Sequence, residues 1–274
     1  MSLSRSIQKL ARFIRTASDL KRLEQAIKLD PSDTSAIQSY VRELVRSNKS
    51  INPSINSIDI AQEYLLQLYN KEVDLSNRSL NITEIQGDLS WLVNLQLPNL
   101  QALGLANNNI TSLDGLSNFK APNLEYLNFK SNKLTSLDGL SGLHAPKLQN
   151  LYLDNNNLTS LDGLSGLHAP SLLVLLLAKN NLTSLDVLSG FKAPNLRYLD
   201  LHSNKLTSLD GLSGLHAPSL IVLLLDHNKI TSLDGLSEFN APKINTITLP
   251  RSAQRSARRL RAVNPTVADA TQFT

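Results

Sequence analysis

The chain of 274 residues has no cysteine, a single tryptophan and only 5% aromatic residues. Without cysteine it can build no disulfide framework, no cysteine-ligated zinc site and no thiol nucleophile. The sequence also lacks any run of about 18 apolar residues, so we expect no membrane-spanning helix. The first residues contain no unbroken apolar core of about 7–15 residues, so we expect no secretory signal. Together these absences predict a folded protein of the cytoplasm, which is a reducing compartment.

A repeat dominates what is present. The dipeptide Ala-Pro recurs every 24 residues, and the sequence between successive copies is nearly constant; the copies begin at Ala121, Ala145, Ala169, Ala193, Ala217 and Ala241. One further repeat begins at Leu97, and a half-repeat, EVDLSNRSL, occupies residues 72–80. A strict period of this length is typical of a solenoid, in which each repeat packs only against its neighbours.

Each repeat carries the pattern L-x-x-L-x-L-x-x-N-x-L, met for example by Leu148, Leu151, Leu153, Asn156 and Leu158. This pattern resembles leucine-rich repeat proteins over about two thirds of the chain, residues 73–250. The phrase T-S-L-D-G-L-S-G-L is similar to the short repeats of phosphatase-regulator and internalin-like proteins. The resemblance implies an α/β solenoid, a horseshoe with a parallel β-sheet on its concave face. The asparagine of the pattern is replaced at the two ends of the array, by Arg78 and Ser252.

The residue pattern predicts the local structure of one repeat. Leucines at alternate positions indicate a short strand, whose successive side chains point to opposite faces, so Leu127 and Phe129 are expected in the core. The asparagine column, which runs from Asn108 to Asn228, is expected to satisfy backbone groups of the turn after each strand. Leucines three residues apart, as in segment 137–143, predict a 3₁₀ turn on the convex side.

The regions outside the repeats are expected to cover the open ends of the solenoid. Residues 1–71 show the helical periodicity of an α-helical N-terminal cap or domain. Residues 72–250 hold about seven repeats plus a half-repeat. Residues 251–274 form a C-terminal capping helix, expected at 252–263, followed by a tail that we expect to be frayed. The basic, serine-rich residues 1–18 are also compatible with a mitochondrial transit peptide.

Variable residues alternate with the leucines and form three columns that point away from the core. Seven strands about 4.8 Å apart give a face roughly 30 Å long, which is the scale of a protein interface. Tyrosines lie there beside aliphatic side chains that we expect to be exposed, a composition typical of a binding patch. Strand propensity would also explain the valines and leucines. The predicted partner-binding residues are Tyr126, Asn128, Lys130, Tyr152, Asp154, Val174, Leu176, Tyr198, Asp200, His202, Val222, Leu224 and Asp226.

Other kinds of site are less favoured by the sequence. Asp200, His202, Asp226 and His227 lie close together on adjacent predicted strands, as acid–base catalysis would need, and aspartates of this face, Asp154 included, could hold a cation. Because no nucleophile stands out and an open face excludes water poorly, we predict no catalytic residue, no metal and no cofactor. The arginine-rich C-terminal helix could meet an acidic partner or a membrane surface, or simply face solvent. Without interleaved aromatic residues it does not favour nucleic acid.

We therefore expect a non-enzymatic scaffold that binds a protein partner on its concave face. A second hypothesis is that the N-terminal helical domain acts on targets that the repeats present. Bacterial effectors and ubiquitin-ligase adaptors, which this layout resembles, work in that way, and an effector would act in the host cytosol. Fold does not decide between the two. Deleting residues 1–70 would decide between the two hypotheses, because a cap is needed for the repeats to fold whereas a separate domain is not.

Overall fold

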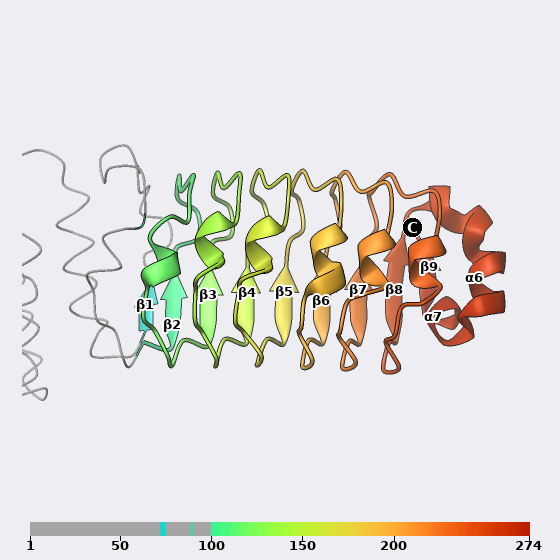
Figure 1. Cartoon of the computed structure of the whole chain (residues 1–274). Coiled ribbons are helices and arrows are strands. Elements are labelled where there is room, and N and C mark those ends of the chain that lie inside the picture. Colours follow the sequence, from blue (N-terminus) through green and yellow to red (C-terminus); the bar gives the residue numbers. More distant parts are fainter. Residues whose placement is uncertain (1–71, 75–88, 90–99) are drawn as a thin grey trace, which may run out of the picture.

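The computed structural model describes residues 72–74, 89 and 100–274. They form a solenoid in which parallel strands stand side by side and 3₁₀ turns line the other side of the core (Figure 1). The helices predicted for residues 1–71 lie outside the described residues, so the N-terminal cap or domain stays a prediction.

In the described part of the chain, nine strands form one sheet, follow chain order and pair in parallel. From β2 onward each step across the sheet advances the chain by one repeat, so that Leu103 pairs with Leu127 and Leu127 with Leu151. This constant register places equivalent residues of all repeats in straight columns. The strands are β1 (Glu72–Asp74), β2 (Ala102–Gly104), β3 (Tyr126–Asn128), β4 (Asn150–Tyr152), β5 (Val174–Leu176), β6 (Tyr198–Asp200), β7 (Val222–Leu224), β8 (Thr246–Leu249) and β9 (Thr271–Phe273).

The repeated leucines fill one continuous core between the sheet and the 3₁₀ turns. Leu127 and Phe129, which the alternation predicts to point inward, are fully buried. Their equivalents in the following repeats, such as Leu151 and Leu153, are buried to the same degree. Burying one leucine side chain contributes about 1.5–3 kcal/mol, and here each is buried by its own repeat and the two neighbouring ones.

The predicted 3₁₀ turns are present on the side of the core away from the sheet. In most repeats the turn begins at an Asp-Gly pair, and the aspartate N–H donates to a serine hydroxyl two residues earlier, as from Asp162 to Ser160 at 3.1 Å. The turns are η1 (Leu116–Asn118), η2 (Asp138–Leu140), η3 (Asp162–Leu164), η4 (Asp186–Gly190), η5 (Asp210–Leu212) and η6 (Asp234–Leu236).

A glycine in these turns allows neighbouring repeats to approach closely. A Cβ atom on Gly163 would lie only 1.9 Å from the carbonyl oxygen of Leu137 in the preceding repeat. In η4 the equivalent residue is Val187, and that turn has five residues where η2, η3, η5 and η6 have three. The turn that carries the larger side chain is thus two residues longer than these four.

The asparagine column acts as predicted. The side-chain amide of Asn132 donates to the carbonyl oxygens of Phe129 in its own repeat and Leu105 in the previous one, both at 2.9 Å. Its Oδ1 accepts from the N–H of Ile110 at 3.0 Å. The same three bonds recur at each following asparagine as far as Asn228. At the end of the array the hydroxyl of Ser252 donates to the carbonyl oxygen of Ile230.

The C-terminal helix is confirmed, but the frayed tail is wrong. A 3₁₀ segment, η7 (Arg251–Ser256), continues into α6 (Ala257–Val263), whose Leu260 is buried. Residues after it form a short helix, α7 (Pro265–Asp269), and then β9, which pairs in parallel with β8 (Figure 1). The tail is ordered because Val267, Ala268 and Ala270 are buried and because β9 completes the hydrogen bonds of the last repeat strand.

Candidate binding surface on the sheet

The predicted site residues lie together on the solvent-facing side of the sheet, which we call the sheet face. The parallel register sets Tyr126 beside Asn150, Val174 beside Tyr198 and Tyr198 beside Val222 in the first column. The second column includes Asn128, Tyr152, Leu176, Asp200 and Leu224. The third column follows directly after the strands and includes Lys130, Asp154, His202 and Asp226. Whether these residues bind a partner stays a prediction.

Their exposure differs from the expected one. Val174, Leu176, Val222 and Leu224 are half-buried, and the large exposed hydrophobic residue beside them is Ile221, at 38%. Each of the four is flanked by side chains on both adjacent strands, which cover part of its surface. These aliphatic side chains therefore contribute a partly covered apolar surface and do not project from the sheet face as a row.

The first part of the sheet face is a polar and aromatic network, which we call the tyrosine patch (Tyr126, Asn128, Lys130, Tyr152 and Asp154). The rings of Tyr126 and Tyr152 meet edge to face, with centroids 5.1 Å apart. The amide of Asn128 donates to the Tyr126 hydroxyl at 2.9 Å, and Lys130 pairs with Asp154 at 3.0 Å. These contacts fix the side chains before any partner binds, which lowers the entropy lost on association.

One oxygen of the tyrosine patch has no partner. Asp154 Oδ1 is buried and accepts no hydrogen bond. Asp226 is the equivalent residue three repeats later, and its Oδ1 accepts a hydrogen bond from the hydroxyl of Thr248 at 2.5 Å. The residue that corresponds to Thr248 in the repeat after Asp154 is Leu176, which has no donor. An unpaired buried acceptor costs about 1–3 kcal/mol. The Lys130 ammonium pairs with Asp154 Oδ2 and leaves Oδ1 unsatisfied.

The second part, which we call the aliphatic patch, consists of Val174, Leu176, Tyr198, Val222 and Leu224. Two acidic side chains border it, and each is paired with a histidine. His202 Nδ1 lies 2.7 Å from Asp200 Oδ1, and His227 Nδ1 lies 2.7 Å from Asp226 Oδ2.

Burial and nearby charges shift two pKa values at the aliphatic patch. Burial raises the pKa of the Tyr198 hydroxyl above its usual value, and the charges of Asp200 and Asp226 raise it further. For Asp226, burial alone would raise the carboxyl pKa, but hydrogen bonds from Thr248 and His227 and the nearby His202 outweigh it, so the pKa is lowered. At neutral pH Asp226 is therefore charged while Tyr198 keeps its proton.

The aspartates and histidines of the sheet face lie in separate pairs, Asp200 with His202 and Asp226 with His227. Among the described residues, no serine or threonine hydroxyl is hydrogen-bonded to either imidazole. Within residues 72–74, 89 and 100–274, no group of three or more metal-ligating side chains gathers. Asp154, Asp200 and Asp226 are each engaged separately along the third and second columns.

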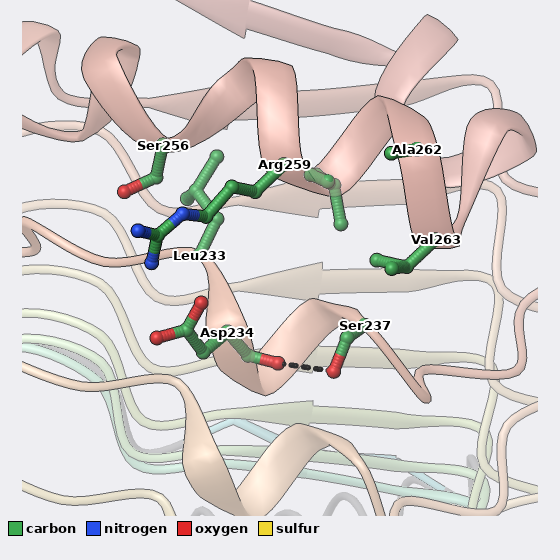
Figure 2. A pocket seen from close by; sticks show the side chains of 8 residues that line it. Leu233, Asp234, Ser237, Ser256, Arg259, Ala262 and Val263 are labelled. Carbon is green, nitrogen blue, oxygen red and sulfur yellow. Dashed lines mark hydrogen bonds between the residues drawn. The ribbon is translucent and has the colours of Figure 1, made fainter.

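A hollow that the sequence did not predict lies away from the sheet face. It measures about 290 Å³ and lies between η6, the 3₁₀ turn of the last full repeat, and the capping helix α6 (Figure 2). Its lining is mainly apolar and includes Leu233, Ala262 and the exposed Val263, with Asp234 and Arg259 at its border. It marks where the cap helix packs against the final repeat.

A parallel sheet, an asparagine column and a 3₁₀ turn in each 24-residue unit define a solenoid repeat protein. Models of leucine-rich repeats match residues 98–142, 122–166 and 170–214, and a further leucine-rich repeat model matches residues 194–251. These matches cover more than half of the chain, which belongs to the leucine-rich repeat family. The fold is typically a protein-binding scaffold and is usually non-catalytic.

Two solved structures share the fold at low sequence identity. Internalin C2 of Listeria monocytogenes is 24% identical, with a TM-score of 0.56 over 77% of this chain and 84% of that one. The internalin InlF of the same organism is 23% identical, with a TM-score of 0.52 over 81% of this chain and 57% of that one. Among curated proteins, no sequence matches this chain. Within the described residues, no helix is long and apolar enough to cross a bilayer.

Proposed function

We propose that the protein is a non-enzymatic scaffold that binds a protein partner on the sheet face, the expected concave side of the horseshoe. The observation that carries this proposal is the distribution of variation among the repeats. The segment LTSLDGLSGLHAP, which spans the 3₁₀ turn, occurs unchanged at 134–146, 158–170 and 206–218. In the same three repeats the second and third columns of the sheet face differ at every position, and the first column has tyrosine at 126 and 198 but asparagine at 150.

This contrast distinguishes residues that the fold requires from residues that are free to serve binding. In most repeats the convex side has the same glycine and leucines, because the repeats approach closely there; Val187 takes the place of the glycine in one turn. The sheet face is free of that demand, yet it carries tyrosines and aliphatic residues in two distinct patches. Tyrosine is enriched among interface residues that contribute most to affinity, and the area of several strands suits a macromolecular partner.

The proposal is tested by truncating one tyrosine in each patch. Tyr152→Ala and Tyr198→Ala are each expected to weaken binding by about 1–2 kcal/mol or more, because each ring lies between neighbouring columns of the face. The measurement is the dissociation constant, by calorimetry, for a partner isolated by affinity capture. Val263→Ala removes an exposed side chain on the cap helix and serves as the control. Unchanged affinity in both tyrosine variants would place the binding site elsewhere.

A further inference from the structure

Another column of exposed residues, separate from the three columns of the sheet face, runs along the edge where each repeat returns to the sheet. It lies immediately before the Ala-Pro dipeptide and contributes one basic or imidazole side chain per repeat. We call this column the Lys/His ladder; its members are Lys120, His144, His168, Lys192 and His216. All five side chains are exposed, and the equivalent residue of the next repeat is Asn240.

A second set of parallel backbone contacts holds the ladder in line. His144 pairs with His168 and Lys192 with His216 as parallel bridges outside the main sheet. The imidazole rings of His144 and His168 stack with centroids 4.9 Å apart and planes 4° from parallel. Ladder side chains therefore project in single file, at about the spacing of adjacent strands.

The positive charge of the ladder is not neutralised within the described part of the chain. The four ion pairs found there are Lys130–Asp154, His202–Asp200, His227–Asp226 and Arg261–Asp269, and none involves the ladder. Further exposed cations, Lys147, Arg197 and Lys243, follow this repeat position by three to five residues. The carboxylates nearest in sequence are Asp114, Glu125, Glu238 and the aspartates that begin the 3₁₀ turns, Asp138, Asp162, Asp186 and Asp210.

We propose that the Lys/His ladder binds a linear polyanion of sulfate or phosphate groups, laid along the axis of the solenoid. A row one side chain wide, with a regular step, suits a chain of anionic groups, each of which can meet successive cations. The ladder contains no phenylalanine, tyrosine or tryptophan, and the rings of His144 and His168 already stack on each other, so a polymer without nucleobases fits it better than single-stranded nucleic acid.

The ring geometry also separates this proposal from a metal site. Imidazole lone pairs lie in the plane of the ring, so the nearly parallel rings of His144 and His168 direct theirs within two separate, nearly parallel planes. Two such planes do not converge on a single ion, and no third metal-ligating side chain joins them among the described residues. An anion that contacts both rings through their N–H groups needs no such convergence.

Binding by the ladder strengthens on acidification. Imidazole changes charge between about pH 5 and 8, so the three histidines add to the two lysines as the pH falls. Protonating two stacked rings places like charges about 5 Å apart, and an anion beside them offsets that repulsion. The polymer therefore binds the protonated ladder more tightly, and by linkage it favours protonation of the histidines.

The test uses the full chain and substitutions that the chain itself supplies. One variant carries His144→Asn, His168→Asn and His216→Asn, and a second carries Lys120→Asn and Lys192→Asn, because Asn240 already occupies this repeat position. The matched control carries Lys133→Asn and Lys205→Asn. These lysines are exposed at the opposite ends of the strands, where other repeats have asparagine.

Binding of heparin and of long-chain polyphosphate is measured at pH 5.5 and pH 7.5 over a range of salt concentrations. The wild type is expected to bind about tenfold or more tightly at the lower pH, and the histidine variant to lose that difference. The lysine variant is expected to bind more weakly at both pH values, with a salt slope reduced by about one for each cation removed. The control keeps its pH dependence. The two polymers distinguish a sulfate from a phosphate source.

Several outcomes overturn the proposal. Equal losses in the ladder and control variants would mean that binding depends on overall charge. If inorganic phosphate binds as tightly as the polymer, binding does not depend on a polymer that contacts successive ladder residues. Binding confined to single-stranded oligonucleotides or to anionic vesicles would assign the edge to another kind of partner. Circular dichroism checks that each variant is folded, and should the triple variant unfold, the lysine variant alone decides through its salt slope.

Discussion

At the scale of the residue, the backbone is left-handed at the position after each third-column residue. The residues with this conformation have φ between 53° and 59° and are Asn107, Ser131, Asn155, Lys179, Ser203 and His227. Asparagine adopts such a φ readily, whereas a lysine there costs about 1–2 kcal/mol. The repeat fixes the turn geometry, so Lys179 is held in it by its neighbours.

Lys179→Asn is therefore expected to raise the free energy of unfolding by about 0.5–1 kcal/mol, because asparagine relieves the backbone strain that the turn imposes. Urea unfolding of the two proteins at the same pH measures the difference. Lys205→Asn makes the same chemical change where the backbone has no positive φ. If both substitutions shift stability equally, the effect comes from charge and the strain argument is wrong.

Residue identity predicted the members of each column but not their surroundings. The alternation of leucines was enough to put Tyr126, Tyr152 and Tyr198 on one face. It could not show that Asp154 keeps an unpaired oxygen, because the missing donor belongs to a residue 22 positions later in the sequence. Half-burial of Val174 has the same origin, since its exposure is set by the adjacent strands.

At the scale of the element, the 3₁₀ turns decide how closely two repeats can stack. The strict 24-residue period made these turns predictable from three leucines and an Asp-Gly pair. The longer turn η4 was not predictable, because nothing local to Val187 specifies how the backbone avoids the preceding repeat. The distance between adjacent repeats depends on residues of both repeats, so the pattern of a single repeat does not predict it.

Gly163→Ala is expected to lower the free energy of unfolding by about 1–3 kcal/mol, because the new methyl group would overlap the carbonyl of Leu137 and push the repeats apart. Gly190→Ala is the matched control, since a Cβ there has nothing within 4 Å. Thermal unfolding followed by circular dichroism compares them, and the control is expected within about 0.5 kcal/mol of wild type. Equal melting temperatures for the two variants would show that the turns do not limit the stacking.

At the scale of the whole molecule, the array ends in a cap that retains the repeat length. Thr271 pairs with Ile247, which lies 24 residues earlier, so β9 continues the register although its leucines are gone. That spacing was the one available signal for β9, and the loss of the leucine pattern concealed it. The described structure thus extends the predicted sheet by one strand.

Deleting residues 271–274 is expected to lower the melting temperature and to promote self-association, because the unpaired edge of β8 would be exposed. The deletion removes the bond from the N–H of Thr274 to the carbonyl of Leu249, at 3.0 Å. Light scattering after gel filtration measures the association. Gln272→Ala, which changes an exposed side chain and keeps the strand, is the control. A deletion variant with the stability and mass of wild type would mean that β9 does not protect the edge.

The central claim is that the sheet face, and not the repeated convex side, binds a protein partner. The most direct test is quantitative mass spectrometry of proteins captured from native lysate by wild type, by the Tyr126→Ala, Tyr152→Ala, Tyr198→Ala variant, and by the Lys133→Asn, Lys205→Asn control. We predict a partner that wild type and control retain and the tyrosine variant loses while remaining folded. The same captured proteins in all three samples would contradict the claim.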